Sequence, residues 1–346
     1  MSIRISNTSI HFGNFTLTAN TEGFSFDGKI RAKRGFVDSS PPNAMGTAFG
    51  YHSHGAFGGL PAPIGAIPIE KFPFALETTV TEVGDVFQER NSLEGTSSDI
   101  SGYVHGGSSI TPGTYVDTIE KYPFATDTNG SDVGNLTEVT TITRGTESFT
   151  SGYSLGGRIS PGSRSTTTNI EKYPFAVDGN SADIGDSTNS REGCAGNSSS
   201  VTGYMAGGGT VDPFVAQNTI DKFPFATDTN ASDVGDLVTA TRNTCGASSK
   251  ENGYILGGTG GGTAIQKFPF ATDTTATDVG DLSNDVYQHA STSSITEGYR
   301  LAGNAPVPSP PATSGTVEKF PFAVDSNSAV LGDLLSTSET GAGNQN

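Results

Sequence analysis

The eleven-residue segment IEKYPFATDTN, at Ile119–Asn129, recurs along the chain in six near copies. Successive copies start 50, 51, 50, 45 and 52 residues apart, and their first residues are Ile69, Ile119, Ile170, Ile220, Ile265 and Val317. A fixed internal period of this length indicates an array of similar units, each too small to bury its own apolar surface. The fold must therefore repeat one unit of about fifty residues six times.

The residues between the copies favour short strands joined by tight turns. The 346 residues include 46 Gly, 18 Pro and no Trp, and only 16% are charged. Gly, Pro, Asn, Asp and Ser are typical of tight turns, whereas β-branched and aromatic residues favour strands. No window places apolar residues at helical spacing without an intervening Gly or Pro. The sequence therefore predicts an all-β fold.

Each period contains four candidate strands. The first is a run of small residues such as Arg191–Ser200, and the second is a GYxxGG segment such as Gly203–Gly208. The third is the repeated motif itself, whose aromatic residues at the fourth and sixth places share one strand face while Ile lies on the other. The fourth is a DVGDL segment such as Val234–Leu237, which follows a turn rich in Asp, Asn and Thr. Because the third strand is apolar on both faces, its sheet needs a neighbour on each side.

Radial stacking of such four-stranded sheets places each sheet between two others and closes the ring. We therefore predict a six-bladed β-propeller over residues 37–336. The motif aromatics are expected to form the core between blades, each contributing about 1.5–3 kcal/mol on burial. These residues are Phe72, Phe74, Tyr122, Phe124, Tyr173, Phe175, Phe223, Phe225, Phe268, Phe270, Phe320 and Phe322.

The ends of the repeat array leave one question open. The first strand of the first blade rests on Asn43–Phe49, the poorest of the six matches to that strand. The chain after Leu334 reads LSTSETGAGN and resembles a first strand as well. Residues 337–346 are therefore predicted to be a C-terminal tail, which in the alternative completes the first blade and closes the ring.

Residues 1–36 lie outside the repeat and differ from it in charge. They carry five basic and two acidic residues, whereas the rest of the chain carries fourteen basic and thirty-four acidic residues. Apolar residues between Ile3 and Ile30 predict two or three strands. We expect a short N-terminal β anchor that docks on an acidic partner by strand addition, with basic contacts from Arg4, Lys29, Arg31, Lys33 and Arg34. The alternative is that this segment packs against the side of the propeller.

The charge and hydropathy of the chain argue against two classes of partner. Its net charge of −17 is concentrated in the repeats, so phosphate backbones and anionic lipid would be repelled, and no nucleic-acid partner is expected. The sequence contains no run of about eighteen apolar residues and no apolar region near its start. We therefore expect a protein made in a cytoplasm without membrane insertion.

The order of these segments resembles the kelch repeat, in which a glycine pair ends one strand and an aromatic-containing strand follows. Typical kelch units carry Trp in the last strand, where this chain has Val133, Ile184, Val234, Val279 or Leu331. The motifs KFPFAxD, DVGDL and GYxxGG more closely resemble those of repeat proteins found among the virion structural proteins of marine cyanobacterial phages. The resemblance covers about residues 37–336 and implies a kelch-like propeller in a virion that is assembled in the host cytoplasm.

From this resemblance we expect a non-enzymatic virion structural protein, either a capsid decoration or a tail or fibre component that contacts the host. Other virion proteins are its expected partners through the N-terminal segment, a homo-oligomer is left open, and no cofactor is expected. The alternative is an adhesion module that binds host-surface glycan. Its candidate surface comprises the variable loops Ser108–Thr118 and Ala305–Thr316.

Kelch-type propellers also include copper radical oxidases, which need a Tyr cross-linked to Cys together with two His ligands. The chain has five histidines, His11, His52, His54, His105 and His289. None of them recurs at one position of the repeat with a Cys and a Tyr nearby. His52 and His54 lie two residues apart in GYHSHGAFGG, so both could lie on one strand face and hold a metal. This segment is a GYxxGG strand with four extra residues, which favours an exposed loop. The sequence therefore predicts no catalytic residue and no metal ligand.

Other polar residues recur at fixed phases. Acids recur in the turn after each motif, and Asp127–Glu138 spaces its oxygens like a calcium loop but lacks Gly at the sixth place. Turn chemistry is therefore preferred over cation binding. The repeated Lys, of which Lys71 is the first, is expected to lie on aromatic rings near these acids. Cys194 and Cys245 each follow an Arg by three residues and are interpreted as equivalent buried thiols, with a disulfide left open.

Overall fold

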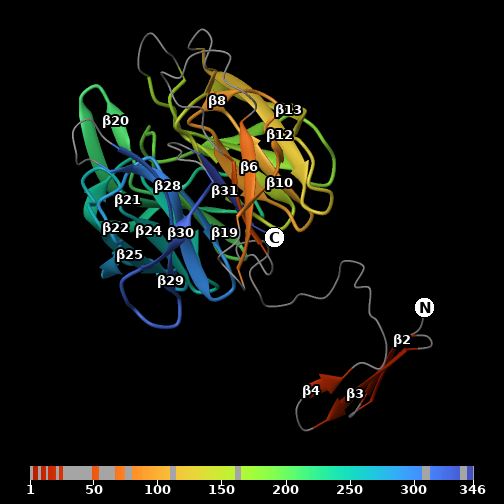
Figure 1. Cartoon of the computed structure of the whole chain (residues 1–346). Coiled ribbons are helices and arrows are strands. Elements are labelled where there is room, and N and C mark those ends of the chain that lie inside the picture. The colour runs from red at the N-terminus through yellow and green to blue at the C-terminus, as the bar shows by residue number, and fades with distance from the viewer. Residues whose placement is uncertain are drawn as a thin grey trace. The chain divides into compact units, whose positions relative to one another are not determined.

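The computed structural model describes the strand backbones within residues 3–25, together with residues 49–53, 67–74, 80–109, 114–159, 165–305, 312–335 and 341–345. Every regular element in these ranges is a β-strand. The chain divides into two compact units, Met1–Ser40 and Pro41–Asn346 (Figure 1). The prediction of an all-β protein is confirmed.

The first unit contains one antiparallel sheet of four strands, where two or three were predicted. The strands follow in sequence order and are β1 (Ile3–Ser6), β2 (Ser9–Phe12), β3 (Phe15–Asn20) and β4 (Gly23–Ser25). The register pairs Ile5 with Ile10, and Ile10 with Leu17. Because directly paired residues belong to the same face of a sheet, the register gathers these apolar residues on one face.

The second unit consists of six antiparallel sheets of at least four strands, numbered here as blades 1–6. From the innermost strand outward, blade 1 contains β31 (Ala342–Gln345), β5 (Phe49–Ser53), β6 (Pro68–Pro73) and β7 (Thr81–Asp85). Blade 2 contains β9 (Glu94–Ser97), β10 (Ser101–His105), β12 (Val116–Pro123) and β13 (Ser131–Thr140). Blade 3 contains β14 (Arg144–Glu147), β15 (Ser151–Leu155), β16 (Asn169–Pro174) and β17 (Ala182–Asp186).

The other three blades repeat this order. Blade 4 contains β18 (Ala195–Ser198), β19 (Thr202–Ala206), β21 (Phe214–Pro224) and β22 (Ser232–Thr241), and β20 (Gly209–Val211) forms a hairpin with the start of β21. Blade 5 contains β23 (Cys245–Ser248), β24 (Asn252–Leu256), β25 (Ala264–Pro269) and β26 (Thr277–Asp281). Blade 6 contains β27 (Ala290–Ser293), β28 (Glu297–Ala305), β29 (Ala312–Pro321) and β30 (Ala329–Asp333). A separate short pair is formed by β8 (Arg90–Asn91) and β11 (Ser108–Ser109).

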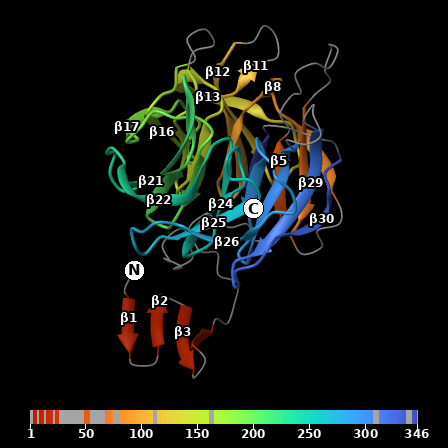
Figure 2. The ribbon, with the colours of Figure 1, turned by 90° about the vertical axis from the view of Figure 1, so that its left-hand side faces the viewer.

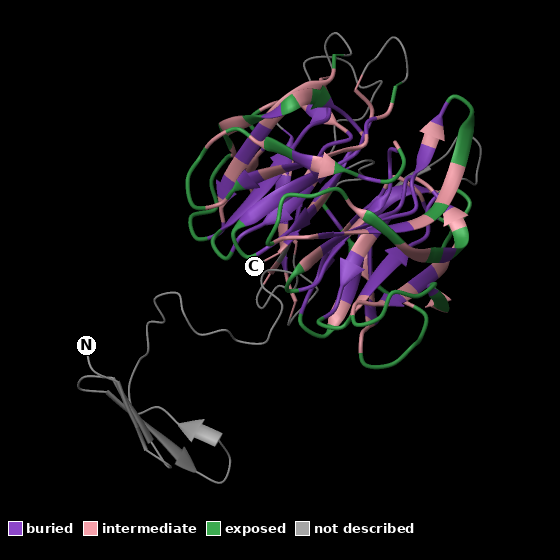
Figure 3. Cartoon of the chain, turned by 180° about the vertical axis from the view of Figure 1, so that it is seen from behind, coloured by how far each residue is buried: buried purple, intermediate pink, exposed green. Residues whose placement is uncertain are grey.

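The innermost strands follow one another around a common axis. Each contacts the innermost strand of the next blade, and the contact of β31 with β9 completes the circle. Figure 2 shows β5 of blade 1 on the same side of this unit as the blue strands β29 and β30 of blade 6. The second unit is therefore a six-bladed β-propeller, as the sequence predicted. Buried residues follow the sheets, whereas exposed residues gather in the turns that join the strands (Figure 3).

The innermost strand of blade 1 comes from the C-terminal segment. β31 pairs with β5 in a register that runs from Ala342 opposite Ser53 to Gln345 opposite Gly50. The sequence predicted a first strand over Asn43–Phe49, but Phe49 begins β5 and β31 takes the place beside β5 in the sheet. Residues 43–48 lie outside the described residues. One sheet thus joins segments from the two ends of the repeat array.

Deleting residues 341–346 should open the ring and lower the melting temperature by several degrees. Asn344 is 1% exposed and donates hydrogen bonds to the carbonyl oxygens of Thr96 (2.7 Å) and Tyr103 (3.1 Å) in blade 2. Each buried hydrogen bond contributes about 0.5–1.5 kcal/mol, and the deletion also removes a strand ladder. Thermal unfolding followed by circular dichroism measures the change. Deletion of Asn346 alone is the control, and equal melting of both truncated proteins would contradict the closure by β31.

Candidate functional site

Aromatic side chains fill the interfaces between blades. In blades 3 and 4, the ring centroid of Tyr153 lies 5.4 Å from that of Phe223 and 4.9 Å from that of Phe225. The same three-ring contact occurs at all six interfaces, where the Tyr of one GYxxGG segment meets both motif aromatics of the next blade. The six motif aromatics at the fourth place are at most 2% exposed; among those at the sixth place Phe124 is buried and the other five are partly buried. These twelve residues therefore lie between sheets.

The second strand of each blade supplies the tyrosine that packs against the motif aromatics of the next blade. The sequence analysis did not assign these tyrosines a role. These tyrosines are almost fully buried, and they are Tyr51, Tyr103, Tyr153, Tyr204, Tyr254 and Tyr299. Their fixed phase in every GYxxGG segment was the signal that could have identified them. Each interface is thus made from two different motifs of adjacent blades.

In blades 2–6, the glycine before each of these tyrosines makes room for a motif aromatic of its own blade. A Cβ atom on Gly203 would approach the ring carbons of Phe223 closer than 3.0 Å, a separation that real Cβ atoms essentially never show. Gly102, Gly152, Gly253 and Gly298 stand in the same relation to the aromatic paired with them. The GYxxGG and IEKYPF motifs therefore depend on each other within a blade as well as between blades.

Replacing Gly203 with Ala should destabilise the propeller by roughly 1–3 kcal/mol, because the added methyl group collides with a ring that cannot move away. The matched control is Gly179→Ala, since a Cβ atom at Gly179 meets nothing within 4 Å. Chemical denaturation of both variants measures the difference. If the two variants unfold at the same denaturant concentration, the close approach of Gly203 to Phe223 is wrong.

A second column of buried polar residues links the blades through backbone amides. The residue after the first Ile or Val of each motif is at most 3% exposed, and these residues are Glu70, Glu120, Glu171, Asp221, Gln266 and Glu318. Each accepts a hydrogen bond from a backbone N–H that lies in the outermost strand of the preceding blade or just after it. The amide of Leu335 donates to Glu70 at 3.0 Å and thereby joins blade 6 to blade 1.

Three of these buried carboxylates also pair with buried arginines. Each arginine belongs to the same blade or to the segment that leads into the innermost strand of that blade. Arg90 lies 2.8 Å from Glu120, Arg191 pairs with Asp221, and Arg300 pairs with Glu318. Burial opposes ionisation of Glu318, but the guanidinium of Arg300 still holds the pKa of this carboxyl below its ordinary value. The sequence analysis did not identify these buried acids. Their signal was an acid or Gln directly after the first Ile or Val in every copy of the motif.

The repeated Lys and the turn acids form a ladder of ion pairs around the rim. The ammonium groups of five Lys lie 2.5–3.0 Å from an Asp in the turn of the next blade, and the pairs are Lys71–Asp127, Lys121–Asp178, Lys172–Asp228, Lys222–Asp273 and Lys267–Asp325. The sixth Lys, Lys319, pairs with Glu297 at 2.9 Å, and the turn acid Glu77 lies outside the described residues. Lys71 also lies 4.4 Å from the ring centroid of Phe49.

A further column of turn acids acts within its own turn. Asp132, Asp183, Asp233 and Asp278 each accept a hydrogen bond from the backbone N–H of the glycine two residues later. Among the described residues, no three His, Cys, Asp or Glu side chains form a group that could hold a metal ion. The geometry of these turns agrees with the turn chemistry preferred from the sequence.

Among the described side chains, the histidines and cysteines occupy buried positions. The expectation that His52 lies in an exposed loop is wrong, because it belongs to β5, pairs in register with Glu70 and is 0% exposed. His54 and the expected docking residues Lys29, Arg31, Lys33 and Arg34 lie outside the described residues, and Arg4 belongs to β1.

The two cysteines are free and buried, which excludes the disulfide alternative in this structure. Burial raises the pKa of the Cys194 thiol to about 11 and that of the Cys245 thiol to about 12. They are not equivalent: Cys245 pairs with Leu256, and the residue that pairs at the same place in blade 4 is Ala195, one residue after Cys194. The connection before β18 therefore differs in length from the one before β23.

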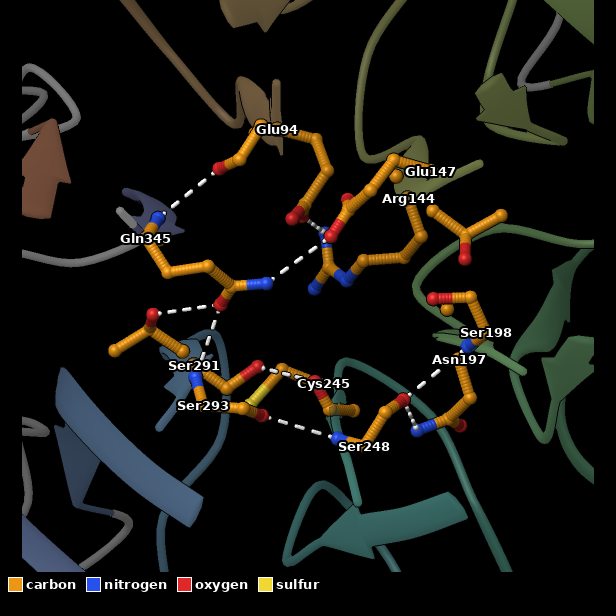
Figure 4. Close-up of a pocket in the computed structure, with 18 residues that line it drawn as sticks. Glu94, Arg144, Glu147, Asn197, Ser198, Cys245, Ser248, Ser291, Ser293 and Gln345 are labelled. Atoms are coloured by element: carbon orange, nitrogen blue, oxygen red, sulfur yellow. Dashed lines mark hydrogen bonds and ion pairs between the residues drawn. The ribbon is translucent and has the colours of Figure 1, made fainter. Parts of the chain in front are cut away.

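All six innermost strands contribute to a cavity of about 50 Å³ on the propeller axis. Figure 4 shows Glu94, Arg144, Glu147 and Gln345 directing their polar ends toward one another across one half of this axial cavity. Most other lining residues are Gly, Ser or Thr. The signal for this site in the sequence was the presence of large polar residues in first strands that otherwise consist of small residues. The sequence analysis did not assign these large residues to a site.

The four large residues cross the axis and connect non-adjacent blades. Arg144 of blade 3 lies 3.4 Å from Glu94 and donates from Nε to the carbonyl oxygen of Thr244, in the connection that enters blade 5 (2.9 Å). Gln345 of blade 1 donates from Nε2 to Glu147 of blade 3 (3.0 Å). The axial cavity is therefore closed on one side by a network of charged and amide groups.

Burial changes the ionisation of both axial carboxyls. Burial raises the pKa of Glu147 to about 8, with the charge of Glu94 adding to the rise. It raises the pKa of Glu94 to about 7 although the guanidinium of Arg144 opposes the rise. A carboxyl whose pKa is raised by folding binds its proton more tightly in the folded protein than in the unfolded chain.

The stability contributed by these protons should be complete below about pH 4.5, the ordinary carboxyl pKa, and should disappear as the pH rises through 7 and 8. Glu147→Gln keeps an acceptor for Gln345 and removes one titrating group. We expect this variant to melt at the same temperature as the parent protein at pH 5 and at a higher temperature at pH 8.5. Glu251→Gln, at an exposed turn, is the control. Parallel pH profiles for the parent and Glu147→Gln would show that Glu147 does not titrate in this range.

No protein-family model and no curated protein sequence matches this chain. The described part of the chain also contains no helix long and apolar enough to cross a membrane. The class that the structure defines is that of a six-bladed β-propeller protein.

Proposed function

We propose that this chain is a non-enzymatic structural protein of a phage virion that displays its propeller on the particle as a decoration or as part of a tail or fibre. The observation that carries the proposal is that most of the ionisable side chains recurring in the blades are engaged between or within blades. The buried acids hold backbone amides, and the Lys and turn acids form the rim ladder. Such repetition suits a rigid display scaffold, and the kelch-like motifs of virion proteins supply the assignment to a phage.

Attachment to the particle is proposed to use the N-terminal unit, whose described strands form a separate sheet. Its excess of basic residues complements an acidic partner, and the register gathers apolar residues on one face of the sheet. The proposed partners are other virion proteins, and a second copy of the chain is the alternative. The location is then the virion, after assembly in the host cytoplasm.

Deleting residues 1–36 should leave the propeller folded but absent from particles. The test compares particles assembled with the full chain and with the deleted chain, and detects the protein by mass spectrometry after purification of the particles. A substitution of Lys29, Arg31, Lys33 and Arg34 by Gln separates the charge of the segment from its strands. Unchanged incorporation of the deleted chain would contradict docking through this segment, and absence of the full chain from particles would contradict the virion assignment.

A second candidate function is glycan binding, favoured by one feature of blade 4. Phe214 is 50% exposed at the start of β21, and the guanidinium carbon of Arg242 lies 4.8 Å from its ring centroid. An exposed ring beside a fixed cation suits contact with a sugar face and its hydroxyl groups. The expected loops Ser108–Thr118 and Ala305–Thr316 are described only in part.

Glycan binding makes its own prediction. If it holds, an array of host-surface glycans should show a hit that is lost in Phe214→Ala and kept in Val201→Ala, a change at an exposed residue in another turn of the same blade. An array without hits for the parent protein favours the purely structural role.

A further inference from the structure

The axial cavity carries more negative charge than the groups around it balance. Its lining includes the carboxyls of Glu94 and Glu147 and the guanidinium of Arg144. Arg144 lies beside Glu94 at 3.4 Å, whereas Glu147 has the amide of Gln345 as its hydrogen-bonding neighbour. When both carboxyls are ionised, the cavity therefore holds one uncompensated negative charge. The remaining titratable group in the lining is the Cys245 thiol, whose raised pKa keeps it neutral.

The cavity lining also includes a hydroxyl that the protein does not use. Thr146 lines the cavity, is 3% exposed, and its hydroxyl has no hydrogen-bond partner among the described residues. Further hydroxyls in the lining, those of Ser97, Ser248 and Ser293, each already accept a hydrogen bond from a backbone N–H. A buried polar atom without a partner costs free energy, so an occupant that supplies the missing contact is favoured.

The size and charge of the cavity limit what it can hold. A volume of about 50 Å³ admits three or four particles the size of water, because one such particle needs roughly 10–15 Å³. An organic ligand is too large, and an anion would be repelled by the two carboxyls. Hard divalent cations take six or more oxygen ligands and commonly several carboxylates, whereas this cavity has one carboxylate in excess.

We propose that the axial cavity binds one small monovalent cation, Na⁺ or K⁺, with a few waters, and that Glu147 is its main charged ligand. Arg144 offsets the charge of Glu94, and the ion offsets that of Glu147. Because the cavity exists only when all six innermost strands are assembled, the ion binds the closed ring and not the unfolded chain. Binding of this kind raises stability with the concentration of the ion.

The test measures the melting temperature of the full chain at pH 8.5 in NaCl, KCl or tetramethylammonium chloride at equal ionic strength. Tetramethylammonium is too large for the cavity. We expect melting to be roughly 2–5 °C higher in NaCl or KCl than in tetramethylammonium chloride. The difference should vanish in Glu147→Gln and should persist in Glu251→Gln. Equal melting in the three salts at pH 8.5, or a difference that survives in Glu147→Gln, overturns the proposal.

A second measurement keeps the proposal open to test if Glu147→Gln fails to fold. Rb⁺ replaces K⁺ in crystals of the parent protein grown at pH 8.5, and its anomalous scattering locates the ion. A peak beside Glu147 on the axis is expected. Its absence in crystals that contain Rb⁺, at a concentration where KCl raises the melting temperature, shows that the salt acts elsewhere and rejects the axial site.

Discussion

The packing of a tyrosine from one blade against two motif aromatics of the next is the interaction on which the rest of the propeller depends. No single blade has a core of its own, because its third strand is apolar on both faces and its second strand points a buried tyrosine outward from the sheet. An offset or tilted aromatic pair contributes about 0.5–1.5 kcal/mol beyond the area that it buries. The sheet becomes stable only when both neighbours are present, so six equivalent contacts have to close on themselves. The contact of Tyr299 with Phe72 and Phe74 completes that circle.

Backbone proximity is the second constraint, and it explains why so much of the chain is glycine. At the axis, a Cβ atom on Gly145 or Gly196 would collide with a carbonyl oxygen of the adjacent innermost strand. At the rim, a Cβ atom on Gly185 of a DVGD-type segment would collide with the turn of the next blade at Thr229, and the φ of +149° adds to the preference for glycine. The aromatic contacts set how close the blades come, and the glycines make that distance possible.

Charge in this protein serves mainly to join one blade to the next. A buried carboxylate is costly unless hydrogen bonds satisfy it, and here the amide of the preceding blade supplies one of them. The rim pairs such as Lys121–Asp178 are more exposed and individually weak, but they repeat around the ring. The axial group of Glu94, Arg144 and Glu147 departs from this repetition, because each of these residues occurs in only one blade. That departure is the reason to look for a ligand there.

The sequence by itself determined the number of blades, the strand order within a blade and the twelve aromatics that face a neighbouring sheet. These features recur at a fixed phase, so that six copies reinforce each local signal, and the alternation of a strand decides which residues share a face. The tertiary structure alone decided that β31 completes blade 1, that His52 is buried and that Cys194 and Cys245 are not equivalent, since each depends on pairing between distant segments or on one residue of loop length. It also decided the axial cavity, because its large polar residues come from β9 (Glu94), β14 (Arg144 and Glu147) and β31 (Gln345). These strands lie far apart in sequence and meet only when a closed ring brings the innermost strands of different blades to one axis.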